Sequence, residues 1–382
     1  MTEPEHPFVD LPAGLVDEVL DKTAAIGDLL LKAFRDAQDG REILRKSLQS
    51  SGLLRKDSEL GYPPLPTTCA ADGSYAVERL LSIDLAAAAA VAVEGLTPPS
   101  EKRYWEGPTH STYIVAERHS IDTPTILRAV MLGRELLLAR KAPHELVMLD
   151  MTFTLPTIYF NQALNLAPHS KELQCSLEFL DHCIEYLEAY RDLLRTERSD
   201  KNFISMPKYS TRREIGLKCE WPGSQDDRST LTQLLEPGEF TSPVLLEQPE
   251  QEWHFNFGGL EPNKKAAVSA LTTEIAQSLS SLRVIHYKPH AWLPALRIEL
   301  GVSAAANEHR VAAVLQGLKH QCATAGMFEP YPLYLADRTV KALARSLPAF
   351  RHVATQRVSE QYDGEIADVF FAMHGYRTES GG

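Results

Sequence analysis

The chain has 382 residues, of which 44% are hydrophobic and 24% are charged, and its formal net charge is −12 at pH 7. This composition is typical of a soluble globular protein with enough apolar residues for a full core. The negative charge argues against a large surface that coats nucleic acid, although a local basic groove is compatible with it. The longest apolar run, residues 85–93, is too short to span a bilayer, so no membrane partner is expected.

The cysteines and the N-terminus indicate the cellular compartment. The five cysteines are scattered, and no two of them have the C-x-x-C spacing of a zinc or redox motif. An odd number without a disulfide framework fits a reducing environment. The first ten residues are acidic and contain proline, unlike a signal peptide. We therefore expect a cytoplasmic protein.

Residues 12–54 predict one or two amphipathic helices, because apolar residues recur there at roughly helical spacing. The recurring positions are Leu15, Val19, Ile26, Leu30 and Phe34. This apolar face could pack on the body of the protein, or it could form a surface for a second subunit or another partner. We expect residues 1–60 to be a helical extension and residues 61–382 to be the main domain.

Two apolar stretches are each followed by an aspartate. Residues 67–71 predict a buried strand ending on Asp72, and the Gly73-Ser74 pair after it favours a tight turn. Residues 146–149 predict a second buried strand ending on Asp150. A strand that ends on a carboxylate can hold a hard divalent cation rigidly. Taken singly, either aspartate has a simpler explanation as a turn or helix-cap residue.

The segment between these aspartates predicts a hairpin, a further strand and a helix. Residues 77–95 are rich in alanine, which favours a helix, but their position after a strand and a Gly-Ser pair favours two strands. Residues 112–116 predict another strand, which Glu117 follows. Residues 123–142 predict a helix that carries Glu135 among leucines.

The C-terminal half is partly regular. Helices are predicted at residues 172–195, 308–326 and from 330 to about 347, and strands at 203–206 and 296–300. Residues 216–283 contain many turn-forming sequences and predict a loop-rich insertion, with strands near 253–257.

The order of these elements is that of ribonuclease-H-like nucleases. A strand with Asp72, a hairpin, a third strand, a helix with Glu135 and a strand with Asp150 follow one another. Carboxylates are hard ligands that suit Mg²⁺ or Mn²⁺. Two such ions about 4 Å apart activate a water and stabilise the leaving oxygen in phosphodiester hydrolysis. The expected fold is α/β, a ribonuclease-H-like core in which helices flank a mixed sheet, with the N-terminal extension and the loop-rich insertion added to it.

Several short blocks, in the same order, resemble the motifs of the NurA nuclease family. They are Asp72-Gly73-Ser74, residues 147–150 (VMLD), Ile204-Ser205 with Lys208, and residues 331–338 (YPLYLADR). The resemblance implies manganese-dependent cleavage of DNA, by single-strand endonuclease and 5′-to-3′ exonuclease activity. It also implies a homodimer that docks on a hexameric HerA-type ATPase, in DNA end processing or antiphage defence.

Carried over to this sequence, the resemblance assigns metal ligands. Asp72 and Asp150 are the two strand-end ligands, and Glu135 is preferred to Glu117 as the helix carboxylate. Asp337 falls where the family has a late acidic or histidine residue near the metal. The expected cofactor is a pair of Mn²⁺ or Mg²⁺ ions.

Residues near these blocks are candidates for contacts with DNA. Lys208 follows a short strand and could bind a phosphate, although it could also be an ordinary exposed lysine. Tyr209 could stack on an unpaired base, and Arg212 and Arg213 could extend a basic lip.

The sequence departs from the family pattern at two places. Met151-Thr152 replace a Gly-Ser pair, and Glu329 replaces a tyrosine, although Tyr331 lies close by. His352 could assist proton transfer, but a lone histidine is more often structural. These departures motivate an alternative, a catalytically silent ribonuclease-H-like subunit that regulates or scaffolds the ATPase. A ribonuclease or a guide-dependent nuclease on the same fold is a third, less favoured reading.

Overall fold

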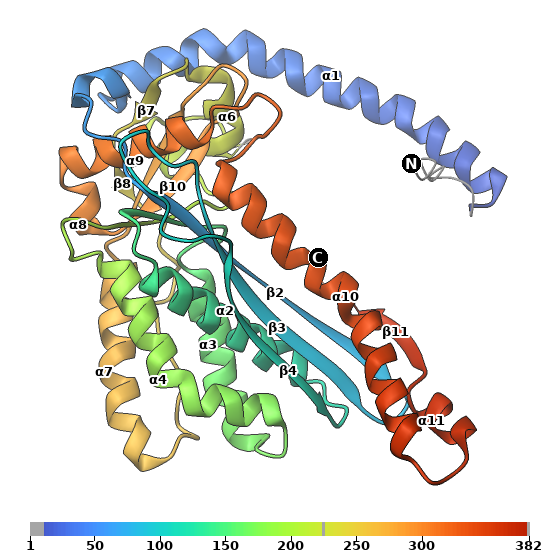
Figure 1. Cartoon of the computed structure of the whole chain (residues 1–382). Helices are drawn as coiled ribbons and strands as arrows, with labels where there is room; N and C mark the ends of the chain where they lie inside the picture. Colours follow the sequence, from blue (N-terminus) through green and yellow to red (C-terminus); the bar gives the residue numbers. More distant parts are fainter. Residues whose placement is uncertain (1–10, 224–225, 380–382) are drawn as a thin grey trace.

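A mixed sheet of eleven strands is the centre of the computed structural model, which describes residues 11–223 and 226–379 (Figure 1). The strand order is β1-β7-β9-β10-β6-β5-β2-β3-β4, with β8 paired to β9 and β11 paired to β2. The pairs β2–β5 and β5–β6 are parallel, and the others are antiparallel. The strands are β1 (Leu54–Lys56), β2 (Thr68–Leu80), β3 (Asp84–Glu94), β4 (Thr109–Glu117), β5 (Leu146–Leu149), β6 (Asn202–Ser205), β7 (Glu239–Thr241), β8 (Val244–Leu245), β9 (Arg283–Lys288), β10 (Leu296–Leu300) and β11 (Gly375–Glu379).

Helices cover both faces of this sheet. Helices α2, α3, α4 and α7 contribute to the large core on one face, and α9 and α10 pack on the other. The helices are α1 (Ala13–Ser50), α2 (Thr123–Lys141), α3 (Leu155–Leu166), α4 (Gln174–Arg195), α5 (Glu214–Lys218), α6 (Asp227–Leu234), α7 (Pro262–Leu279), α8 (Val302–Ala305), α9 (Glu308–Gln321), α10 (Tyr331–Gln361) and α11 (Ile366–Ala372), with short 3₁₀ turns η1 (Asp57–Leu60) and η2 (Ala167–His169). The predicted ribonuclease-H-like α/β core with a mixed sheet is confirmed.

The alanine-rich segment forms strand β3, as its sequence context predicts. Its side chains alternate between the two faces. Ala86, Ala88 and Ala92 belong to the core that contains α2, whereas Ala89 and Val91 pack with residues of α10. Both faces are therefore buried under a helix, and small side chains let the two helices lie close to the strand. Packing outweighs the intrinsic helix preference of alanine here.

The expectation of a turn after Asp72 is wrong. Strand β2 continues from Thr68 to Leu80, and Gly73 pairs in register with Ala90 of β3. The chain reverses instead at residues 81–83, where Leu80 N–H donates to the Ile83 carbonyl. Glycine at position 73 lets α2 pack closely against β2, because a Cβ there would lie 2.7 Å from the Met131 sulfur of α2. Asp72 is thus fixed in the middle of a long, paired strand.

Residues 216–283 are not a loop-rich insertion. They contain α6, β7, β8 and the long helix α7, and β7 lies between β1 and β9 in the central sheet. The strands expected near 253–257 do not form. The sheet also includes β1 from the expected N-terminal extension, so the extension and the main domain share one sheet.

Helix α1 is one continuous helix that projects from the body (Figure 1). Its C-terminal part is anchored, through the buried Leu48 and a bond of 2.8 Å from Arg45 to Glu239. The apolar residues of the predicted face are exposed, namely Leu15, Val19, Ile26 and Leu30, while the side chain of Phe34 lies outside the described residues. This stretch therefore does not pack on the body of the chain. Within residues 11–223 and 226–379, none of the helices has both the length and the apolarity needed to cross a bilayer.

Candidate metal centre

Three aspartates from distant parts of the chain meet at the centre of the sheet. The parallel register pairs Ala71 of β2 with Leu149 of β5, so the next residues, Asp72 and Asp150, lie side by side. Helix α10 runs alongside β2 and β3 (Figure 1). It adds Asp337 from its second turn. One carboxylate oxygen of each aspartate lies within 4.8 Å of the others. Such a cluster can supply the oxygen ligands of a hard divalent cation.

Glu135 lies directly beside this cluster. It is 3% exposed on α2, and its Oε2 would lie 3.0 Å from a Cβ added to Gly73. Burial, followed by the charges of Asp72 and Asp150, raises the pKa of Glu135 well above its usual value. Its Oε1 is buried without a hydrogen-bond partner among the described residues. Glu135 therefore borders the site but is not one of the three mutually close aspartates.

Glu117 has a different surrounding. Its carboxylate accepts hydrogen bonds from Thr123 Oγ1 at 2.7 Å and from the Cys175 backbone N–H at 3.1 Å. These contacts satisfy it at the starts of α2 and α4. Of the two glutamates considered from the sequence, the structure brings Glu135 to the aspartates.

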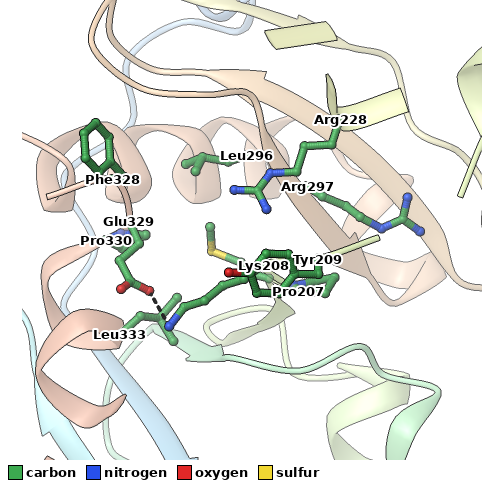
Figure 2. A pocket seen from close by; sticks show the side chains of 11 residues that line it. Pro207, Lys208, Tyr209, Arg228, Leu296, Arg297, Phe328, Glu329, Pro330 and Leu333 are labelled. Atoms are coloured by element: carbon green, nitrogen blue, oxygen red, sulfur yellow. Dashed lines mark ion pairs between the residues drawn. The ribbon is translucent and has the colours of Figure 1, made fainter. Parts of the chain in front are cut away.

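Lys208 connects the acidic residues. Its ammonium nitrogen lies 2.7 Å from Asp150 Oδ2, 3.1 Å from Glu329 Oε2 and 3.6 Å from Asp337 Oδ1. Figure 2 shows the Lys208–Glu329 pair at the edge of a pocket. Lys208 reaches this position because β6, parallel to β5, delivers the following loop to the same edge as Asp150. It is therefore not an ordinary solvated lysine.

The cluster is short of positive charge. Burial, followed by repulsion from Asp150 and Asp337, raises the pKa of Asp72 to about 7. Burial raises the pKa of Asp150 to about 6, although the bond from Lys208 opposes the shift. Burial lowers the pKa of Lys208, but its contacts with Asp150 and Glu329 outweigh this and raise it overall. Beyond Lys208, Lys341 is the other cation paired with the cluster among the described residues, at 2.8 Å from Asp337. An excess of converging carboxylates fits a bound divalent cation.

Comparisons with known proteins identify the fold. No family model matches the sequence, and no curated protein matches it. Solved structures of NurA share its architecture. The NurA nuclease from Sulfolobus solfataricus superposes with a TM-score of 0.57 at 12% identity, over 91% of this chain and 99% of that one. This chain has the NurA fold. NurA with manganese gives a TM-score of 0.52 at 13% identity, over 90% and 99% of the chains. NurA bound to dAMP and manganese gives a TM-score of 0.50 at 12% identity, over 84% of this chain and 93% of that one.

The first departure from the NurA motif pattern has a local structural basis. Where Gly-Ser is usual, the Thr152 hydroxyl donates to Glu299 at 2.8 Å, and the Phe153 backbone N–H donates to the same carboxylate at 2.8 Å. Glu299 is in turn held by Arg297 at 3.3 Å. The turn after Asp150 is thereby tied to β10, which fixes the direction of the aspartate.

The second departure from the NurA pattern adds a residue that sequence reasoning missed. Glu329 precedes α10 in a loop without periodicity, yet it pairs with Lys208. The sequence feature that could have indicated Glu329 as a site residue is its replacement of the family's tyrosine at this position. Tyr331, the first residue of α10, is half-buried and lies two residues further on.

The remaining predicted residues lie away from the aspartates. Arg212 pairs with Glu247 at 3.4 Å, and Arg213 donates to the Trp221 carbonyl at 2.7 Å, so both stabilise the loop around α5. His352 is exposed on α10, 15 residues after Asp337, or roughly 20 Å along the helix. It therefore lies too far from the cluster of its own chain for direct proton transfer there. Tyr209, 93% exposed, follows Lys208 at the pocket mouth.

Proposed function

We propose that this protein is a metal-dependent deoxyribonuclease that hydrolyses phosphodiester bonds. The observation that carries the proposal is the convergence of Asp72, Asp150 and Asp337, with carboxylate oxygens within 4.8 Å of one another. Their oxygens suit Mn²⁺ or Mg²⁺. The solved structures that share the fold include NurA with manganese and NurA bound to dAMP and manganese, which supports a nuclease reading.

The carboxylates and the lysine of the cluster have different roles in this proposal. Asp72, Asp150 and Asp337 would hold the metal, and Glu135 adds a further carboxylate beside them, enough for the two ions expected. When bound, such ions activate a water and stabilise the charge on the phosphate and the leaving oxygen. Lys208 balances the negative charge and supplies a donor that reaches a phosphate oxygen at the pocket edge.

The partners are also part of the proposal. We expect single-strand endonuclease and 5′-to-3′ exonuclease activity, a homodimer, and docking on a HerA-like hexameric ATPase in DNA end processing or antiphage defence. The exposed apolar side chains of α1 support a protein partner, because they do not pack on the body of the chain. The net charge of −12 supports delivery of DNA by a partner.

The test is cleavage of single-stranded and linear duplex DNA in Mn²⁺, in Mg²⁺ and in EDTA. Wild type is compared with Asp72→Asn and Asp150→Asn, with and without the ATPase. Loss of a direct ligand should cost at least about 100-fold in rate, since even residues behind the ligands cost 10–100-fold. Asp181→Asn is the matched control, because its side chain is 75% exposed on α4. Cleavage that survives both substitutions would place the active site elsewhere.

The alternative is a catalytically silent subunit that regulates or scaffolds the ATPase. One observation favours it: the Lys208 ammonium already occupies part of the acidic cluster, bound to Asp150 and Glu329. ATPase binding without cleavage in any metal would support this alternative over the nuclease.

A further inference from the structure

A pocket of about 200 Å³ opens beside the acidic cluster (Figure 2). Lys208 and Glu329 form the wall that it shares with the cluster. The rest of the lining comes from the segment that follows β6, from the loop before α10, and from α6, β10 and α10. Pockets for drug-sized ligands are larger, about 300–1,000 Å³. A space of this size suits a single planar ring system. Its position beside the cluster suits a group that is attached to the nucleotide next to the phosphodiester bond.

The chemistry of the wall matches the face of a nucleobase. The floor is apolar, since Met206, Leu296 and Leu333 are each 5% exposed or less. Two aromatic rings lie at the mouth, Tyr209 with 93% exposure and Phe328 with 66%. Single-strand nucleic-acid sites combine apolar surfaces with aromatic rings because every base has a face that can stack.

Arg228 supplies the positive charge that the cluster lacks. Its Nε donates to the Ala295 carbonyl at 3.2 Å, which is the one hydrogen bond of this side chain within the described residues. Figure 2 shows its guanidinium pointing toward the pocket interior, across from the Lys208–Glu329 pair. Arg297, the other arginine of the wall, is engaged by Glu214 at 2.7 Å. The terminal N–H groups of Arg228 are therefore directed toward whatever enters, and they suit a base edge or a phosphate.

We propose that this pocket takes one unpaired base of the DNA strand, next to the phosphate held at the aspartates. Phe328 and Tyr209 stack on the base, and Arg228 donates to its edge or to the adjoining phosphate. This inference rests on the proposed nuclease function and deepens it. A base still paired in a duplex cannot enter without being flipped out of the stack, so the pocket selects single strands.

The test is a binding measurement that does not depend on cleavage. A short single strand is titrated with the protein in Ca²⁺, a cation that carboxylates bind. It is compared with strands in which one base at a time is removed. We expect one position where base removal weakens binding by about 5- to 150-fold, the range of one base–aromatic stack. At that position 2-aminopurine should lose fluorescence on binding.

Variants assign the effect to the pocket. In Phe328→Ala the intact strand should bind about 5- to 150-fold more weakly, and removal of the base should then cost clearly less than it does in wild type, because the contacts of Tyr209 and Arg228 remain. Phe371→Ala, at an equally exposed phenylalanine of α11 (69%), should behave as wild type. Circular dichroism confirms that the variants are folded.

The outcomes separate the two proposals. A position-specific base effect without cleavage in Mn²⁺ would support the pocket and overturn the nuclease. Cleavage with no position sensitive to base removal would support the nuclease and overturn the pocket. An equal loss in Phe328→Ala for intact and base-less strands, or no binding of single strands, would also overturn the pocket.

Discussion

Replacing Lys208 by glutamine should separate metal binding from catalysis. The ammonium holds Asp150 at 2.7 Å, and the two side chains are 30% and 8% exposed. Removing one partner of a buried ion pair costs about 3–5 kcal/mol, whereas an exposed pair contributes about 0.2–1. For this half-buried pair we expect a loss of about 1–2 kcal/mol in the free energy of unfolding of the metal-free protein.

The Lys208–Asp150 interaction energy should also change the affinity for Mn²⁺. In wild type, a cation must displace the ammonium from Asp150, so Lys208→Gln removes that cost. Mn²⁺ should then bind about 5- to 30-fold more tightly, since 1.4 kcal/mol is tenfold. The cleavage rate should fall, because the donor nearest to the phosphate is gone.

Titration calorimetry with Mn²⁺ and single-turnover cleavage measure the two effects. Lys341→Gln is the matched control, because Lys341 pairs with the same cluster but is 59% exposed. It should change the Mn²⁺ affinity by less than about threefold. Weaker Mn²⁺ binding in Lys208→Gln, or equal effects of both substitutions, would refute the idea that the ammonium competes with the metal.

Three further predictions follow from the packing and the charges. Gly73→Ala should lower the free energy of unfolding by about 1–3 kcal/mol and lower activity, because the new Cβ would lie 2.7 Å from Met131 and 3.0 Å from Glu135. Urea unfolding measures the loss. Gly14→Ala is the control, because a Cβ there would have nothing within 4 Å. Burial lowers the pKa of His286 to about 3. The unfolded chain therefore binds a proton at this histidine below pH 6.5 while the folded one does not, and the His286 contribution to stability should fall by about 1.4 kcal/mol per pH unit toward pH 3. His286→Gln should lose about 2 kcal/mol less than wild type between pH 6.5 and 5, and parallel curves would contradict this. Mn²⁺ at 100 times its dissociation constant should stabilise the protein by about 2.7 kcal/mol, reversibly with EDTA, and equal stabilisation of Asp72→Asn would contradict the site.

Strong local patterns made much of the fold predictable. Helices α2 and α4 and strands β4, β5 and β10 follow from periodicity. Strand β3 could be predicted only from its neighbours, because alanine alone favours a helix. The role of residues 216–283 was missed, since β7 has three residues and is specified by pairing with β1 and β9 rather than by its own sequence.

The site was less accessible from sequence than the fold. Asp150 can be predicted as a strand-end residue because it follows a short apolar run. Gly73-Ser74 predicts a turn instead of a strand, because the sequence does not show that Met131 packs closely against Gly73. Asp337 follows only from the family resemblance, because it has no local signal, whereas Lys208 is indicated both by the resemblance and by its position after a short strand. Glu329 joins the cluster through the position of α10, which is a tertiary effect.

The most direct test of the central claim is a crystal structure of the wild-type protein with Mn²⁺, with anomalous diffraction to locate the metal. We expect an anomalous peak bounded by Asp72, Asp150 and Asp337, with Lys208 displaced from Asp150. A fully folded protein with no peak at this cluster, or with manganese bound at another place, would contradict a metal site at these aspartates.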